Sequence, residues 1–585
     1  MKVYNINEIL PGVIIISLTV NSIGGVIDIS YSSILFITIV FAIIVGISST
    51  LLLIKSYLSF TATDFVIAII TIGYFFSHQP FDNLWNMASI ALFFIYWMLR
   101  LTGKLNYFFL YTSILISDII LIITGYLQYI GYITSDSSFC KITGPYQNSS
   151  IYAGVLCLLM SAIIAWCLYP GYRLRYQKLY ITSVILFILS IPPLLITTCR
   201  SAWLALLLVS IIMYCTHSPQ IIKRTMKWSL FHIKLGTIGL VLLTTIFIYG
   251  LYILKKDSVD GRLLIWKVTL QMIKDKPITG FGSDGFISNY MFYQASYLKS
   301  NGSDREKFLA GNNHIVYNEP LRFTVEYGLL GLLLYIGIVH MVLKKQKTNI
   351  SILLARSVLM SGVIWGFFSY PGNAFPVLVI IMLAFLVTIM NKKRKYIKHK
   401  SLINVLKSIR LLNLSISCIF LISGIYIYHN HHIFFNSLKL IHENKIENFI
   451  SECSKLERIM KNETFFWMIY CKALEREKYD CLLLEKITNW ERLYPCSDVY
   501  IMKGDLLQRM QKNDQAEDAY WLAHYMVPSR QKARSRLALL YKKEGLMDDA
   551  LVLVHDILSE KVKIYGFETY EIHQDLKRIF ENQLK

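Results

Sequence analysis

Long apolar runs alternate with short polar connections over roughly the first 430 residues of the chain. Runs long enough to cross a bilayer lie at 10–28, 33–54, 62–78, 84–100, 106–127, 149–169, 179–198, 201–216, 232–253, 323–343, 351–370, 373–391 and 411–428. Because a spanning helix needs about 20 apolar residues, this pattern predicts an all-α, polytopic membrane bundle of about 12 or 13 spans. A mean hydropathy of +0.47 with 55% hydrophobic residues excludes an ordinary soluble protein.

Basic residues fall on every second connection between the runs. They are Lys55, Arg100 with Lys104, Arg173 with Arg175 and Lys178, and the stretches 223–234, 344–347 and 392–400. Cytoplasmic connections are enriched in Lys and Arg, so we place these inside, with the N-terminus. The connections 129–148 and 254–320 and everything after Tyr428 then face outward. The first apolar block lacks a small-residue cleavage site, so we expect no cleaved signal peptide.

The formal charge of +21 follows from these clusters. Cations beside apolar runs bind an anionic membrane surface, so we expect membrane lipid as a partner and no nucleic acid. The ten cysteines show no CxxC pair and predict no metal site or disulfide framework. Cys453, Cys471, Cys481 and Cys496 could pair only in an oxidising compartment. His429, His431 and His432 lack a carboxylate or thiol nearby, so we expect no metal there either.

The composition becomes polar and helix-forming at about His429, which predicts a membrane domain over 1–428 and a second helical domain over 429–585. Repeats of 34 residues are visible in the second domain. Ala516, Tyr520, Ala523 and Pro528 have the spacing of the second half of a tetratricopeptide unit, and Gly504 stands where that unit needs a small residue. The positions 34 residues later are Ala538, Ala550, Val554 and Ile557, and those 34 earlier match less well.

Residues 463–562 therefore resemble two to three tetratricopeptide repeats. Such repeats stack into a solenoid with a curved surface that binds peptides or proteins, so a protein partner is expected for this domain. The alternative is a generic helical bundle.

Gly280, Gly282 and Gly285 spell the G-x-G-x-x-G of dinucleotide-binding folds, which requires a strand before it and a helix after it. The preceding WKVTLQMIKDKP instead predicts an amphipathic helix with apolar Trp266, Val268 and Met272. We therefore expect a tight turn that folds the long polar connection 254–320 back on the membrane, and no cofactor.

Two arginines occur at the outer ends of apolar runs. Arg200 lies in TTCRSAWLALLL and Arg262 in DGRLLIW. Arginine at membrane depth is costly and marks a functional site unless it extends to the interface. Paired guanidinium groups are suited to a phosphate or pyrophosphate, because each can donate two parallel hydrogen bonds to its oxygens.

The segment NNHIVYNEPLRFTVEYG holds the other candidate residues. Asn318 and Pro320 suit the start of a helix, which places Glu319, Arg322 and Glu326 on one face of a helix that enters the membrane. These charges should line a cavity or pair with each other. His314 and Glu319 are the candidates for a general base near neutral pH.

These residues resemble the O-antigen ligase and polymerase superfamily of bacterial inner membranes, which includes protein O-oligosaccharyltransferases. The resemblance rests on TTCRSAWLAL, on GRLLIWKVTLQMIKDKPITGFGSDGF with NYMFYQASYL, and on HIVYNEPLRFTVEYGLLGLLLY, and it covers roughly residues 10–390. It implies that a glycan on undecaprenyl pyrophosphate is passed to an acceptor hydroxyl at the periplasmic face, without cofactor or metal.

The resemblance also implies residue roles. Arg200 and Arg262 match the family's pyrophosphate-binding arginines, and His314 or Glu319 is the implied base. We expect Tyr317, Asn318, Arg322, Glu326 and Trp266 to bind or position substrate. The family often has a histidine directly before the asparagine of its third motif, where this chain has Tyr317, so the choice of base stays open.

The function predicted on this basis is O-antigen ligation to lipid A-core. The alternatives within the superfamily are a polysaccharide polymerase and a protein O-oligosaccharyltransferase. A non-enzymatic transporter or membrane-tethered scaffold is the alternative outside it, although the spans show no internal repeat of the kind found in transporters.

Overall fold

The computed structural model describes residues 6–20, 31–52, 62–77, 83–102, 106–135, 140–169, 175–217, 250, 252–253, 255–344, 349–390 and 402–584. Within these ranges the chain forms helices and no strand, so the predicted all-α class is confirmed. The predicted span at 232–253 lies almost entirely outside the described residues. The predicted cytoplasmic cation Lys55 and the basic stretches 223–234 and 392–400 lie outside them as well.

The chain divides into two compact units, and each contains parts distant in sequence. The first comprises Met1–Leu251, Tyr317–Glu319 and Leu334–His431. The second comprises Tyr252–Val316, Pro320–Leu333 and His432–Lys585, so the long polar connection groups with the C-terminal helices. The two-domain division predicted at residue 428 did not anticipate that grouping.

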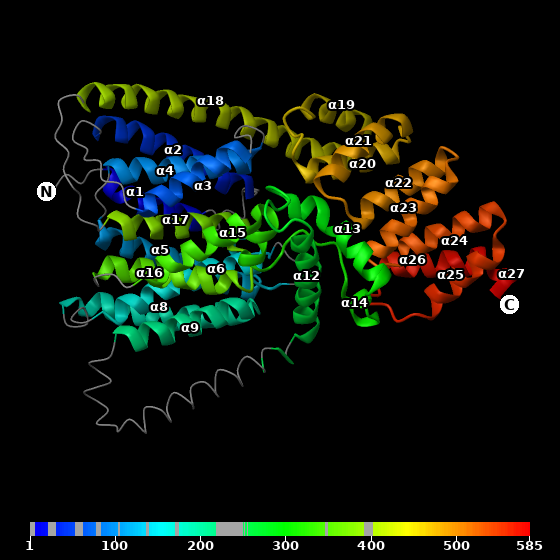
Figure 1. The fold of residues 1–585 in the computed structure, drawn as a ribbon, viewed down its shortest axis with the longest axis horizontal. Coiled ribbons are helices and arrows are strands. Elements are labelled where there is room, and N and C mark those ends of the chain that lie inside the picture. Colours follow the sequence, from blue (N-terminus) through cyan, green and yellow to red (C-terminus); the bar gives the residue numbers. More distant parts are fainter. Residues whose placement is uncertain are drawn as a thin grey trace. The chain divides into compact units, whose positions relative to one another are not determined.

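The first unit is a bundle of apolar helices that lie side by side (Figure 1). Its helices are α1 (Ile6–Val20), α2 (Tyr31–Leu52), α3 (Ala62–Ser77), α4 (Leu84–Thr102), α5 (Tyr107–Ile130), α6 (Ser149–Cys167), α8 (Gln177–Ile196), α9 (Arg200–His217), α16 (Ile350–Gly366) and α17 (Phe375–Met390), with parts of α15 (Glu319–Leu343) and α18 (Leu402–His442). Among the described residues, six helices have the length and apolar composition to cross a membrane, and six more are apolar but shorter. The chain is a multi-pass membrane protein.

Arg100 corrects one detail of the predicted topology. It does not belong to a solvent-facing connection but lies in the last turn of α4, where it is 5% exposed. Its Nε and Nη2 donate to the two carboxylate oxygens of Asp64 on α3, at 2.9 and 3.0 Å. A buried guanidinium without such a partner would be very costly, so the pair fixes α3 against α4.

The polar connection in the second unit contains three helices. They are α12 (Lys256–Asp275), α13 (Gly285–Ser300) and α14 (Asp304–Leu309). The repeat region follows with α19 (Ile446–Leu456), α20 (Thr464–Arg476), α21 (Asp480–Leu493), α22 (Ser497–Arg509), α23 (Asn513–Met526), α24 (Lys532–Glu544), α25 (Met547–Ser559), α26 (Phe567–Ile579) and α27 (Glu581–Leu584).

The repeat helices follow the period that the sequence indicated. First helices begin at Thr464, Ser497 and Lys532, and second helices at Asp480, Asn513 and Met547, at intervals of 33 to 35 residues. The residues predicted to pack are buried, namely Ala516, Tyr520, Ala523, Ala538, Ala550, Val554 and Ile557. A side chain at Gly504 would place Cβ 2.4 Å from the ring of Tyr520, so glycine is required there. Assignment to the tetratricopeptide family stays a prediction.

The polar connection packs on the repeat helices through a shared apolar core. Phe286, Tyr290 and Met291 of α13 are buried together with Ala523 and Met526 of α23. The repeat region therefore buries one face against the connection. This packing holds the segment 309–316 on a folded support.

Candidate functional site

Glu319 is the most enclosed of the predicted catalytic residues. It is the first residue of α15 and only 4% exposed. Its Oε1 accepts a 2.8 Å hydrogen bond from the backbone N–H of Gly372, in the connection between α16 and α17. The Cβ that any other residue would add at Gly366 would lie 3.2 Å from the Cγ of Glu319. The carboxylate is thus fixed at one end of the bundle by close packing and a backbone donor.

The two residues before Glu319 contact the same connection. Tyr317 has a φ of +56° and packs edge-to-face on Tyr370, with ring centroids 5.5 Å apart. The Nδ2 of Asn318 donates to the carbonyl oxygen of Phe367 at 3.1 Å. A positive φ in a residue with a side chain is costly and persists only where its surroundings enforce it. The structure therefore holds both predicted substrate-binding residues in one defined conformation.

Tyr370 links this region to the start of α6. Its hydroxyl donates to the Oδ1 of Asn148 at 3.3 Å, and that oxygen caps α6 by accepting from the N–H groups of Ser150 and Ile151. Burial, with smaller contributions from Tyr317 and Cys199, raises the pKa of Tyr370 to about 12, although hydrogen bonds to Ser150 and Asn148 act in the opposite direction. The phenol therefore stays protonated at neutral pH.

We call this region the bundle-end cluster, which comprises the following residues: Asn148, Cys199, Arg200, Tyr317, Asn318, Glu319 and Tyr370. Arg200 is half-buried and begins α9, two residues after Thr198, whose φ is +54°. Helices α6, α9 and α15 all begin in this cluster. Helix N-termini carry partial positive charge and the guanidinium adds a full one, while Glu319 contributes a negative charge at the start of α15 and Asn148 caps α6.

Arg262 and Trp266 lie one turn apart on α12 in the second unit, and both are half-buried. The indole Nε1 of Trp266 donates to the carbonyl oxygen of Val316 at 3.0 Å. Trp266 therefore ties α12 to the segment that carries His314 and Tyr317. The substrate contact expected for Trp266 stays a prediction.

Arg322 and Glu326 form an ion pair on α15, with Nη1 3.0 Å from Oε2. The sequence left open whether these charges pair or line a cavity, and pairing is observed. Two residues further on, Gly328 breaks the helix with a φ of +60°.

The turn that contains Gly280 and Gly282 packs against α15 just before the break at Gly328. Gly280 and Gly282 have positive φ, and the N–H groups of Phe281 and Gly282 donate to the carbonyl oxygens of Val325 and Glu326 at 2.9 and 2.8 Å. A Cβ at Gly280 would lie 2.4 Å from the oxygen of Glu326. A helix precedes the turn instead of a strand, so the tight turn is confirmed and the arrangement differs from a dinucleotide-binding fold.

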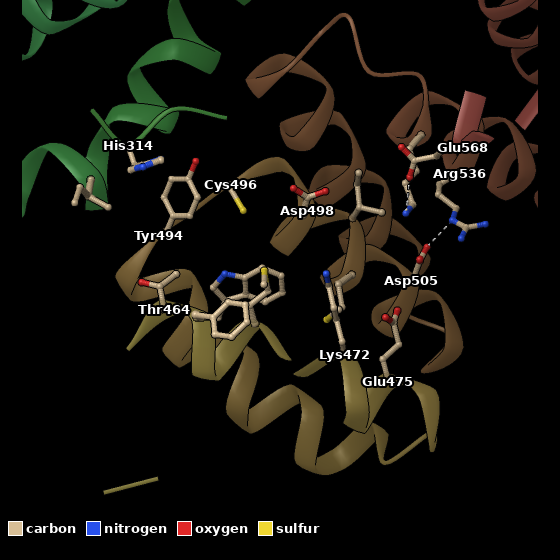
Figure 2. A pocket seen from close by; sticks show the side chains of 17 residues that line it. His314, Thr464, Lys472, Glu475, Tyr494, Cys496, Asp498, Asp505, Arg536 and Glu568 are labelled. Carbon is tan, nitrogen blue, oxygen red and sulfur yellow. Dashed lines mark ion pairs between the residues drawn. The ribbon is translucent and has the colours of Figure 1, made fainter. Parts of the chain in front are cut away.

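His314 lies in a different environment from Glu319. It lines a cavity of about 1050 Å³ within the second unit, which we call the loop–repeat cavity, and its ring packs edge-on against Tyr494 at 5.9 Å (Figure 2). Burial lowers the pKa of His314, so the imidazole is neutral at pH 7 and can accept a proton. The two candidate bases thus belong to different units although only five residues separate them in sequence.

One ionisable group inside the bundle, Asp118, was not among the predicted site residues. Asp118, in the middle of α5, is fully buried and accepts a 3.0 Å hydrogen bond from Ser190 on α8. An aspartate within an apolar run was the available signal, because such residues at membrane depth are rare. Among the described residues, no group of three or more His, Cys, Asp or Glu side chains is arranged to hold a metal ion.

Comparison with known proteins points to one family. Residues 185–336 match the family model described as O-antigen ligase. A protein of Rickettsia felis named "Putative polysaccharide ligase" is 31% identical over 103 residues, which is 17% of this chain and 23% of that protein. The chain thus matches about a quarter of that relative's length. All nine predicted site residues fall within the matched segment 185–336.

Proposed function

We propose that this chain, whose residues 185–336 match the O-antigen ligase family model, transfers a glycan from undecaprenyl pyrophosphate to a hydroxyl of lipid A-core. The single observation that carries the proposal is that the family match contains both arginines and both candidate bases. The reaction takes place at the periplasmic face of the bacterial inner membrane. The N-terminus is cytoplasmic and the repeat region periplasmic, following the alternation of basic connections.

Arg200 and Arg262 bind the pyrophosphate in this proposal. As the bond between the anomeric carbon and the pyrophosphate oxygen breaks, negative charge grows on that oxygen. Cations that are already in position stabilise the charge that develops in the transition state. They do so without the cost of rearranging during the reaction. The partial positive charge at the start of α9 adds to that of Arg200.

His314 is the proposed base. The acceptor hydroxyl attacks the anomeric carbon, its proton passes to the neutral imidazole, and undecaprenyl pyrophosphate leaves with the electrons of the broken bond. Glu319 is the alternative base, and its enclosure with one oxygen on the Gly372 N–H also suits a positioning role. Tyr317, Asn318 and Trp266 hold the segment between the two candidates.

The function is tested first in a deletion strain, by running surface lipopolysaccharide on a gel beside exported glycoproteins. Loss of the whole ladder while polymer accumulates on its lipid carrier supports the ligase. Collapse of the ladder to one repeat unit would identify a polymerase, and an intact ladder with lighter glycoproteins a protein O-oligosaccharyltransferase. If neither changes, the enzymatic proposal is wrong.

The arginine role is tested by complementing that strain with Arg262→Ala, Arg262→Lys and Arg305→Ala. We expect Arg262→Ala to lower transfer about 10²- to 10³-fold, because a charge aimed at the leaving group is lost. Arg262→Lys should recover only part of the activity, since ammonium lacks the forked geometry. Arg305 is the matched control, as it lies in the same connection and forms exposed ion pairs with Asp257 and Asp260. Full transfer by Arg262→Ala at normal protein level would refute the role.

A further inference from the structure

The loop–repeat cavity has walls of two chemical kinds. Aromatic side chains form one part, with Tyr494 beside His314 and with Trp490 and Phe465 also in the lining. Ionic side chains form the other, and Figure 2 shows them away from His314. They are Lys472, Glu475, Asp505, Lys532, Arg536 and Glu568. The volume of about 1050 Å³ is at the upper end for small-molecule sites, so the cavity holds a ligand of several rings or residues.

Four of the six ionic side chains of this wall form two ion pairs with each other. Arg536 Nε lies 3.1 Å from Asp505 Oδ1, and Lys532 Nζ lies 2.9 Å from Glu568 Oε1. Asp498, at the rim, pairs with Arg530 at 3.0 Å. A charged ligand would have to break these pairs or leave a charge unmatched. A neutral ligand rich in hydroxyl groups can instead donate to the carboxylates and accept from the cations without disturbing them.

The two aromatic side chains beside Tyr494 in the lining differ in exposure. Trp490 is 2% exposed and belongs to the apolar core of the repeat helices, so its indole N–H is covered by protein. Phe465, 45% exposed, adds an apolar ring to the same cavity. An exposed ring beside polar groups suits the C–H face of a pyranose, whose hydroxyls project from its edge.

We propose that the loop–repeat cavity binds a neutral oligosaccharide segment of the acceptor. The cavity also contains His314, so a saccharide bound there approaches the proposed base. The inference rests on the proposed function for the identity of the saccharide, but the binding itself is measured separately.

The test uses the full-length protein in nanodiscs. The probe is the saccharide released by mild acid from the host's own lipopolysaccharide, and its affinity is measured by isothermal titration calorimetry. We expect saturable binding that Phe465→Ala weakens about tenfold, because a stacked ring is lost.

Tyr479→Ala is the matched control. Tyr479 is 43% exposed, precedes α21 and does not line the cavity, so its removal should leave saccharide affinity unchanged. Thermal melting of each variant confirms that it is folded. In the transfer assay, Phe465→Ala should raise KM for the acceptor and leave kcat near wild type, which a merely structural defect would not do.

Other outcomes overturn the inference. Absence of saccharide binding, or equal binding by wild type and Phe465→Ala, would show that the cavity is not the site, even where Arg262→Ala still abolishes transfer. Phe465-dependent binding of tryptic peptides from exported proteins, without saccharide binding, would identify a peptide groove. Saccharide binding with normal transfer by Arg262→Ala would instead refute the arginine role and leave the cavity assignment standing.

Discussion

The bundle-end cluster and the loop–repeat cavity hold the two candidate bases in opposite settings. Glu319 is enclosed, with one oxygen on a backbone N–H and its stem packed against Gly366. His314 lines an open cavity large enough for substrate, and burial keeps its imidazole neutral. Residues close in sequence can thus receive different tasks, because the chain passes from one compact unit to the other between them.

The contrast leads us to propose His314 for proton transfer and Glu319 for positioning. A general base must reach the substrate and have a pKa near the working pH. A positioning residue must be rigid, and burial with a fixed hydrogen bond provides that. His314 fits the first description and Glu319 the second.

The largest expected effect is that of the variant His314→Ala on kcat, and it tests this proposal directly. His314→Ala should lower kcat for glycan transfer about 10²- to 10⁴-fold, because general-base catalysis is lost. Wild-type activity should fall as the pH drops through the folded pKa of His314, which burial sets below the usual value near 6.5. That acid limb should be missing from the residual activity of His314→Ala.

Glu319→Gln is the paired variant for this experiment. Its carboxamide oxygen can still accept from Gly372, so the loss of kcat should be smaller and the acid limb should remain. The assignment is reversed if Glu319→Gln causes the larger loss and His314→Ala keeps the wild-type pH profile.

An intermediate effect is expected at the contact that holds the His314 segment on the repeats. The Nδ2 of Asn312 donates to Asp498 at 2.8 Å, and its Oδ1 accepts from the N–H and hydroxyl of Ser497, both at 3.1 Å. Asn312→Ala should lower the free energy of unfolding by about 1–3 kcal/mol and reduce transfer by displacing His314.

Asn301→Ala, at the exposed end of α13, is the control for that variant. Thermal melting and acceptor KM are measured for both proteins. A change in melting temperature without any change in transfer would mean that the repeats do not position His314.

The smallest expected effect concerns the pH dependence of stability. Burial opposes ionisation of Glu306, but hydrogen bonds from Lys267, Ser303 and Tyr297 outweigh it and lower the pKa from 4.5 to about 2. A lowered folded pKa stabilises the protein above the unfolded pKa and loses that contribution as pH falls from 4.5 towards 2. Glu306→Gln should therefore lower the free energy of unfolding by about 1 kcal/mol at pH 7. This value is small because solvent around the exposed Lys267 weakens the ion pair.

Melting temperatures at pH 7, 4 and 2.5 check this expectation. The difference between wild type and Glu306→Gln should shrink as the pH falls. A difference that stays constant across the range would show that the lost contact is not ionic.

Several features of the fold could be predicted because they depend on local pattern. The spans follow from apolar runs of the necessary length, and the repeat period follows from small residues at fixed spacing, such as Gly504 against Tyr520. The tight turn at Gly280 and Gly282 follows from the backbone freedom of glycine. The location of Arg200 at the start of a helix was likewise expected from the end of its apolar run.

The sequence by itself thus determined the all-α class, the apolar helices and the repeat period, because each is encoded within a few turns of the chain. Only the tertiary structure decided that Arg100 is buried against Asp64, that Arg322 pairs with Glu326, and that the connection packs on the repeats around His314. Burial and pairing depend on which distant segments meet. No local pattern carries that information, since the same charged residue is stable in solvent or in a core once its partner is present.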